Sequence, residues 1–149
     1  MPFADIEARS SDGRTVLLVE AKSKLRTSAE WAARMRSNLV ATFPVSARFF
    51  LLATPDRFYF WTDGAGEPRP LPPAVMLDPH AILLPYFERA GIERERLNET
   101  SFELVLASWL RDLTRRPPAE APATYPLQLV ETGLFEALYG ASLLYQQHW

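Results

Sequence analysis

The most constraining feature of this 149-residue sequence is the stretch of residues 15–22, which reads TVLLVEAK. Its start is continuously apolar, which is typical of a strand that is buried on both faces of a sheet. Glu20 and Lys22 stand two positions apart at the polar end of this strand, so we expect their side chains to project to the same side. The chain is therefore expected to build its fold around a sheet.

Two further patterns extend this sheet. Residues 3–9 alternate apolar and polar side chains, and the Asp-Gly turn within residues 10–13 should fold them back onto residues 15–22 as a β-hairpin. Residues 47–54 and 57–61 predict a second hairpin. The aromatic side chains of residues 58–61 could stack on unpaired bases, but a packed strand is the favoured interpretation.

A helix is predicted between the two hairpins. Residues 27–30 read TSAE, a capping box in which the hydroxyl of Thr27 would accept a hydrogen bond and Glu30 would reach back. An apolar stripe follows at every fourth residue, and Pro44 should end the helix; its members are Trp31, Met35, Leu39 and Phe43. The order strand, strand, helix, strand, strand predicts an α/β fold with a mixed sheet.

The second half of the chain has a different composition. Residues 64–79 form a proline-rich connector, and residues 80–90 predict a short helix. A second capping box at residues 100–103 should begin a longer helix that ends before Pro117, and residues 132–144 predict a last helix. We therefore divide the chain into an α/β core (1–63), the connector (64–79) and a helical region (80–149) that packs on the core or on a second subunit, with a homodimer as one expectation.

Composition excludes several kinds of chemistry. The sequence has no cysteine and only two histidines, His80 and His148, which excludes disulfides and thiolate sites and argues against a histidine-rich metal site. It has no apolar run of the ~20 residues that a membrane span needs and no secretory signal, so a cytoplasmic protein without a membrane partner is expected. Any catalysis should depend on carboxylates, lysine or hydroxyl groups.

The candidate site consists of Asp5, Glu20 and Lys22. On a hairpin, Asp5 near the start of the first strand can lie beside Glu20 near the end of the second, and paired carboxylates are ligands for Mg²⁺ or Mn²⁺. Lys22 could orient or deprotonate a water, or stabilise charge on a phosphate. Two other carboxylates stay open as alternatives to Asp5: Glu7, which shares its face, and Asp12 in the turn.

The pattern Asp5 … Glu20-x-Lys22 on adjoining strands, followed by a capped helix and another strand, resembles the PD-(D/E)XK nuclease superfamily. The resemblance covers residues 3–63 and implies a restriction-endonuclease-like core, a mixed sheet flanked by helices, with a helical C-terminal extension. It also implies that Asp5 and Glu20 bind the metal ion and that Lys22 serves the attacking water.

The sequence departs from this family pattern in two places. Ala4 stands before Asp5, where the family pattern has proline. The family also usually has a helix, often with an acidic residue, before the first core strand, and here four residues precede Asp5. A C-terminal helix, a second subunit or a further N-terminal segment would have to supply this layer, and residues 93–96 (ERER) could donate the carboxylate.

Charge is unevenly distributed along the chain. Residues 1–63 hold nine Lys/Arg against seven Asp/Glu, whereas residues 64–149 hold seven against eleven. The basic segment is compatible with phosphate binding, and also with an ordinary solvated surface. The candidate nucleic-acid contacts in it are Lys24, Arg26, Arg34, Arg36 and Asn38.

Two functions follow from these observations. The first is a Mg²⁺- or Mn²⁺-dependent phosphodiesterase that cuts nucleic acid, DNA more than RNA. The second is a catalytically silent module of the same fold that serves in nucleic-acid binding or protein assembly.

Overall fold

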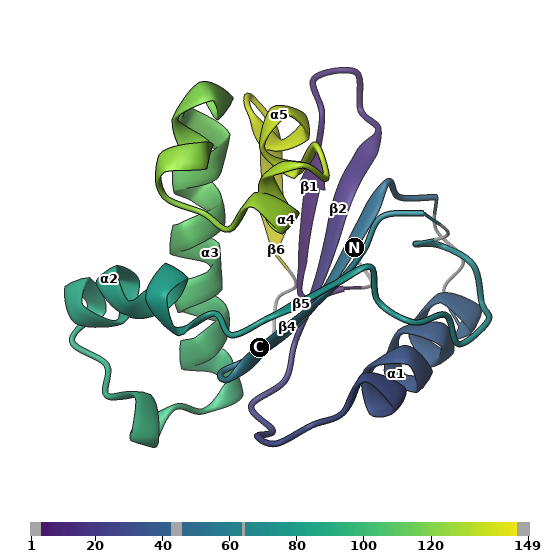
Figure 1. The fold of residues 1–149 in the computed structure, drawn as a ribbon, viewed down its shortest axis with the longest axis horizontal. Coiled ribbons are helices and arrows are strands. Elements are labelled where there is room, and N and C mark those ends of the chain that lie inside the picture. The colour runs from purple at the N-terminus through teal and green to yellow at the C-terminus, as the bar shows by residue number, and fades with distance from the viewer. Residues whose placement is uncertain (1–3, 43–45, 64, 146–149) are drawn as a thin grey trace.

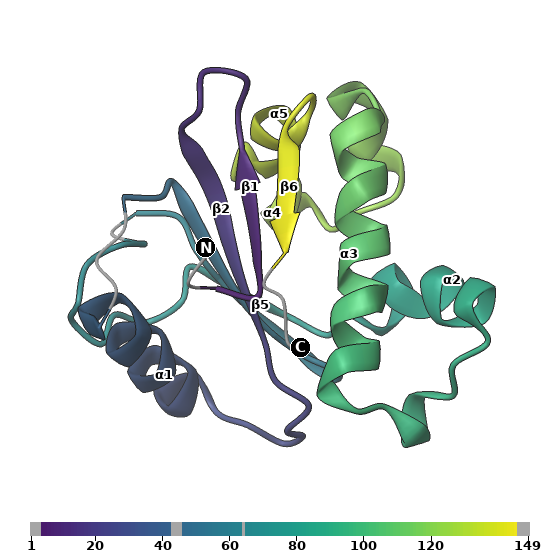
Figure 2. The same cartoon turned by 180° about the vertical axis from the view of Figure 1, so that it is seen from behind.

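The computed structural model describes residues 4–42, 46–63 and 65–145. A six-stranded mixed sheet, in the order β5-β4-β3-β2-β1-β6, lies between helix α1 on one face and the remaining α-helices on the other (Figures 1 and 2). The elements are, in chain order, β1 (Ile6–Arg9), β2 (Thr15–Ala21), α1 (Ala29–Thr42), β3 (Phe49–Thr54), β4 (Arg57–Trp61), β5 (Val75–Leu77), α2 (His80–Ala90), η1 (Arg94–Arg96), α3 (Glu99–Arg115), η2 (Pro118–Ala123), α4 (Leu127–Val130), α5 (Leu134–Leu138) and β6 (Ser142–Tyr145). The predicted α/β fold with a mixed sheet flanked by helices is confirmed.

Both predicted hairpins are present. β1 pairs antiparallel with β2, with Ile6 opposite Val19, and β3 pairs antiparallel with β4. Between the hairpins, α1 crosses over the sheet and returns the chain so that β3 runs parallel to β2. The apolar residues of β2 are buried, as a strand with neighbours on both sides and helices on both faces requires.

Helix α1 is predicted correctly, but its cap and its buried face are not. Ser28, rather than Thr27, caps the helix, because its hydroxyl oxygen accepts from the backbone N–H of Trp31 at 3.1 Å. The Thr27 hydroxyl instead bonds the Tyr59 hydroxyl at 2.8 Å. The fully buried face contains Ala32, Ala33, Arg36, Ser37 and Val40.

The predicted stripe of α1 therefore lies beside the buried face. Trp31, Met35 and Leu39 are only partly buried and pack around the smaller cluster of apolar residues on this side of the sheet. Ala32 and Val40 of the buried face belong to this cluster, and the larger side chains of the stripe pack at its margin. Phe43 and Pro44, assigned to the stripe and to the helix stop, lie outside the described residues.

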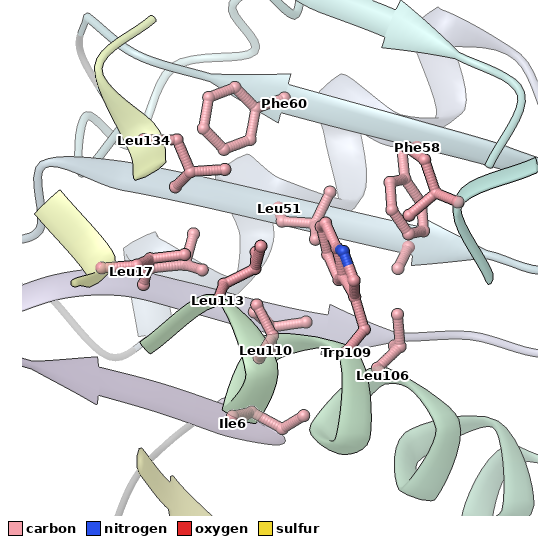
Figure 3. Packing of buried hydrophobic residues seen from close by; sticks show 14 of the residues in the cluster. Ile6, Leu17, Leu51, Phe58, Phe60, Leu106, Trp109, Leu110, Leu113 and Leu134 are labelled. Atoms are coloured by element: carbon pink, nitrogen blue, oxygen red, sulfur yellow. The ribbon is translucent and has the colours of Figure 1, made fainter. Parts of the chain in front are cut away.

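The larger hydrophobic core lies on the other face, under α3 (Figure 3). Trp109 of α3 is 1% exposed and its ring centroid is 5.4 Å from that of Phe58 on β4. Leu106, Leu110 and Leu113 continue the buried face of the same helix. Phe58 and its neighbours through Trp61 are 1–2% exposed, so the aromatic strand is part of the core rather than a surface for stacking bases.

The end of the chain corrects another prediction. Residues 132–144 are expected to be helical, but the helix α5 covers only Leu134–Leu138, and Ser142–Tyr145 form strand β6. Gly140, at φ +80°, makes the turn between them. β6 pairs antiparallel with β1, with Leu143 opposite Ala8, and so becomes an edge of the sheet. Within the connector, β5 supplies the opposite edge.

Candidate metal centre at the carboxyl end of β2

The pairing of β1 with β2 brings the first two candidate residues together. Because Ile6 lies opposite Val19, the preceding Asp5 comes beside the following Glu20. Asp5 is 6% exposed and Glu20 7% exposed. One carboxylate oxygen of Asp5, Oδ2, accepts a hydrogen bond from the backbone N–H of Ala21 at 2.7 Å, which fixes the side chain against the end of β2.

Lys22 lies at the same end of the strand. Its backbone N–H donates to the carbonyl of Ala53 at 2.9 Å and so extends the pairing of β2 with β3. Its ammonium nitrogen is 3.4 Å from a carboxylate oxygen of Glu20 and 3.7 Å from one of Glu99. The side chain is about one third exposed, at 32%, so it can still meet a ligand from solvent.

Two further carboxylates come from α3, far away in the sequence. Glu99 and Glu103 are four residues apart and therefore share one face of the helix. One oxygen from each lies with an oxygen of Asp5 in a group whose members are all within 4.8 Å of one another. We call Asp5, Glu20, Glu99 and Glu103 the acidic cluster; Asp5 and Glu20 are buried, Glu103 is half-buried and Glu99 is exposed.

A cap holds this part of α3 in place. The Asn98 side chain accepts from the backbone N–H of Ser101 at 2.8 Å, and the Ser101 hydroxyl accepts from the backbone N–H of Asn98 at 3.1 Å. This capping box begins the helix two residues earlier than the predicted one at Thr100. The earlier start places Glu99 in the first turn of the helix.

The contribution of α3 to the acidic cluster is not evident from the sequence. Residues 93–96 were the expected source of a further carboxylate, but Glu93 forms an ion pair with Arg96 at 3.2 Å and is not part of the group around Asp5. The available signal was the i, i+4 spacing of Glu99 and Glu103 at a helix start. That signal is too common to select a metal site without the sheet beside it.

The acidic cluster alters the titration of its members. Burial and the negative charge of Asp5 raise the pKa of Glu20 to about 7, against the opposing effect of Lys22. Burial lowers the pKa of Lys22, but the charges of Glu20 and Glu99 outweigh this effect and its pKa lies above the ordinary value. Lys22 is therefore a cation at neutral pH, and it can orient or stabilise an anion but cannot accept a proton.

The two alternative carboxylates have structural partners elsewhere. Glu7 is 5% exposed, and its Oε1 accepts from the Thr15 hydroxyl at 2.6 Å and from Arg9 Nε at 3.0 Å. Asp12 accepts from the backbone N–H of Arg14 at 3.2 Å within the β1–β2 turn. Asp12 lies beyond the opposite end of β2 from Glu20, and the Glu7 carboxylate is bonded to Thr15 at that end; neither joins the group around Asp5.

The predicted nucleic-acid contacts divide into exposed and buried residues. Lys24, Arg26, Arg34 and Asn38 are exposed in the segment after β2 and on α1. The Lys24 ammonium lies 5.4 Å from the ring centroid of Trp31, so it is held above the start of α1. These residues stay candidates for phosphate contacts.

Arg36 is placed differently. Expected to face solvent or a ligand, it is 0% exposed, because its guanidinium donates to the backbone carbonyls of Ala65 and Glu67, both at 2.8 Å, and of Arg69 at 2.5 Å. The ring centroid of Trp61 lies 5.3 Å from the same guanidinium. Arg36 thus attaches the proline-rich connector to α1, and we do not retain it as a nucleic-acid contact.

The donor set of the acidic cluster fits a hard divalent cation. Carboxylate oxygens are the ligands that Mg²⁺, Mn²⁺ and Ca²⁺ prefer, and the three close oxygens of Asp5, Glu99 and Glu103 could hold a metal ion.

In the part of the chain that the structure describes, no helix is long and apolar enough to cross a membrane. No protein-family model matches this chain, and neither a curated protein nor a solved structure matches it.

Proposed function

We propose that this protein is a Mg²⁺- or Mn²⁺-dependent phosphodiesterase that cleaves nucleic acid, with its active site at the acidic cluster and Lys22. The observation that carries the proposal is the convergence of three carboxylates within 4.8 Å beside a lysine that is ion-paired to two of the cluster's members. The like charges of Asp5, Glu99 and Glu103 repel one another, and a divalent cation would offset this repulsion, most strongly at the buried Asp5.

The resemblance to the PD-(D/E)XK superfamily supports this proposal. Asp5, Glu20 and Lys22 match the sequence pattern of that superfamily and lie together at one end of the antiparallel pair of β1 and β2, and the parallel strand β3 follows after one helix. Helix α3, which follows these strands in the sequence and lies against the same sheet, would take the place of the family's acidic helix.

Each residue then has a separate role. Asp5, Glu99 and Glu103 would hold the divalent cation, with Glu20 next to them. When bound, the cation would supply Lewis acidity toward a phosphoryl oxygen. Lys22, as a cation fixed between Glu20 and Glu99, would orient the attacking water and stabilise the negative charge that develops on the phosphate. The exposed Lys24, Arg26, Arg34 and Asn38 would contact the backbone of the substrate.

Cleavage assays test this proposal. Supercoiled plasmid, single-stranded DNA and RNA are incubated with Mg²⁺ or Mn²⁺ and the wild type, Lys22→Ala, Glu103→Gln, or the control Glu88→Gln on the exposed face of α2. We expect metal-dependent cutting that Lys22→Ala and Glu103→Gln each reduce about 100-fold or more. Glu88→Gln should cut like the wild type.

A parallel thermal-shift measurement distinguishes the phosphodiesterase from a catalytically silent module of the same fold. Mn²⁺ should raise the melting temperature of the wild type, because it binds the folded state, and Glu103→Gln should weaken that rise. A rise without cleavage of any substrate would favour the silent module. No rise and no cleavage would contradict the metal centre itself.

A further inference from the structure

A second polar site lies at the opposite end of β2 from the acidic cluster. An open pocket of about 650 Å³ is bounded by the β1–β2 turn, by the chain that leads into β3 and by α5. It includes Thr15, the first residue of β2. Thr15 and Glu20 are five positions apart, which corresponds to about 17 Å along a strand, so the pocket is distinct from the proposed active site.

The lining of this pocket is basic. Its lining residues include two arginines, three residues with hydroxyl groups and three small apolar residues, and no Asp or Glu is among them. Two of the hydroxyls already donate elsewhere, that of Thr15 to Glu7 and that of Ser10 to Asp12. The arginines Arg14 and Arg48 therefore carry the polar character of the pocket.

Arg48 is held in position without a charged partner. Its guanidinium carbon lies 4.7 Å from the ring centroid of Phe49, which is buried in the sheet. The guanidinium also lies next to Gly133, where an added Cβ would come 3.0 Å from Nη2 of Arg48. Among the ion pairs of the described residues, none involves Arg48. The contacts with Phe49 and Gly133 thus restrict the guanidinium of this exposed residue, while its charge stays available.

Arg14 can add a second charge. It pairs with Asp12 at 3.5 Å, but their side chains are 87% and 59% exposed. An ion pair between two exposed side chains is screened by solvent and contributes little to stability. Arg14 can therefore exchange Asp12 for a more strongly charged anion.

We propose that this pocket binds a phosphate group, with Arg48 as the principal contact and Arg14 as the second. The planar guanidinium group matches phosphate oxygens with two parallel hydrogen bonds, which a chloride ion or a carboxamide cannot reproduce. The size of the pocket and its small apolar lining residues leave room for a sugar or base attached to that phosphate. The phosphate can come from a free nucleotide or from a nucleic-acid strand, and the assay below separates these sources.

Binding is measured by isothermal titration in EDTA, so that the result does not depend on the acidic cluster. The probes are inorganic phosphate, adenosine 5′-monophosphate and a single-stranded DNA decamer without a terminal phosphate. We expect Arg48→Gln to weaken binding at least tenfold, Arg48→Lys to weaken it less, and Arg14→Gln to weaken it about threefold. The control Arg96→Gln removes an exposed arginine outside the pocket and should change binding less than twofold.

A variant of α5 tests the pocket without altering either arginine. Ala137→Glu introduces a negative charge into the lining and should abolish binding, while thermal melting shows that the protein is still folded. Tighter binding of the nucleotide than of the decamer identifies a free nucleotide as the source, and the reverse order identifies a nucleic-acid strand. The proposal is overturned if none of the three probes binds, or if Arg48→Gln and Ala137→Glu bind them like the wild type.

Discussion

At the residue scale, Glu20 experiences two opposing influences. It is buried beside Asp5, which disfavours its charged form, and it is paired with Lys22 at 3.4 Å, which favours that form. The first influence is the larger, and it raises the pKa of Glu20 from 4.5 to about 7. A carboxyl group in this state binds its proton more tightly in the folded protein than in the unfolded chain.

This shift makes stability depend on pH in a defined direction. Between pH 4.5 and pH 7 the folded state holds more protons than the unfolded state, so the free energy of unfolding falls as the pH rises. We expect Glu20→Gln to remove this fall and to raise the free energy of unfolding at pH 8 by about 1–3 kcal/mol. Below pH 4.5 the variant and the wild type should have equal stability.

Urea denaturation at several pH values in EDTA measures this effect. Glu30→Gln, which removes an exposed carboxyl group at the start of α1, is the matched control for the loss of one carboxylate. A Glu20→Gln variant that is less stable than the wild type at pH 8 would show that the pair with Lys22 outweighs burial.

Arg36 shows at the same scale how a charged residue becomes structural. Its guanidinium supplies hydrogen bonds to three carbonyls of a proline-rich segment that cannot form regular pairs of its own. Arg36→Leu should therefore lower the free energy of unfolding by about 3 kcal/mol, since it leaves these carbonyls without their donor. The exposed neighbour Arg34 provides the control, and Arg34→Leu should change the free energy of unfolding by less than about 0.5 kcal/mol.

Chemical denaturation gives these values, and limited proteolysis locates the change. Faster cleavage within residues 65–73 is expected for Arg36→Leu alone. Equal stability of the two variants would contradict the role assigned to the guanidinium.

At the scale of elements, the start of α3 determines where Glu99 and Glu103 lie. Asn98→Ala removes the acceptor for the Ser101 N–H and should cost about 1 kcal/mol of stability. Because the first turn then frays, Mn²⁺ should also bind more weakly. Thr100→Ala, at the residue that the sequence alone suggested as the cap, should change the stability by less than about 0.5 kcal/mol.

Thermal melting with and without Mn²⁺ measures both quantities in one experiment. If Thr100→Ala proved the more damaging change, the helix would begin at the later position. Mn²⁺ affinity that is unaltered in Asn98→Ala would separate the cap from the metal centre.

At the scale of the whole molecule, the last strand joins the two halves of the chain. β6 pairs with β1, and Leu143 packs against the larger core that α3 covers. Leu143→Asp should lower the free energy of unfolding by about 2–3 kcal/mol, because it brings a charge toward apolar surroundings. Ser142→Asp, on the adjacent exposed residue, should cost less than about 1 kcal/mol.

Urea denaturation monitored by tryptophan fluorescence tests this prediction, because Trp109 lies in the same core. If the two substitutions were equally mild, β6 would not be an integral strand of the sheet in solution.

Local patterns in the sequence determined both hairpins, the helix between them and the neighbourhood of Asp5, Glu20 and Lys22. The alternation of apolar and polar residues, the turn residues and the short loop are all local, within about twenty residues. They determine which strands pair and which side chains meet. The pairing of Ile6 with Val19 then requires no information from the rest of the chain.

The tertiary structure alone decided three features: the contribution of α3 to the acidic cluster, the burial of Arg36 and the formation of strand β6. Glu99 and Glu103 meet Asp5 only because the large core under α3 sets the position of that helix on the sheet. Arg36 is buried because the connector, about thirty residues later, presents its carbonyls to it. Residues 142–145 form a strand because the edge of β1 offers them backbone partners, and contacts so distant in sequence leave no periodic pattern in the residues that make them.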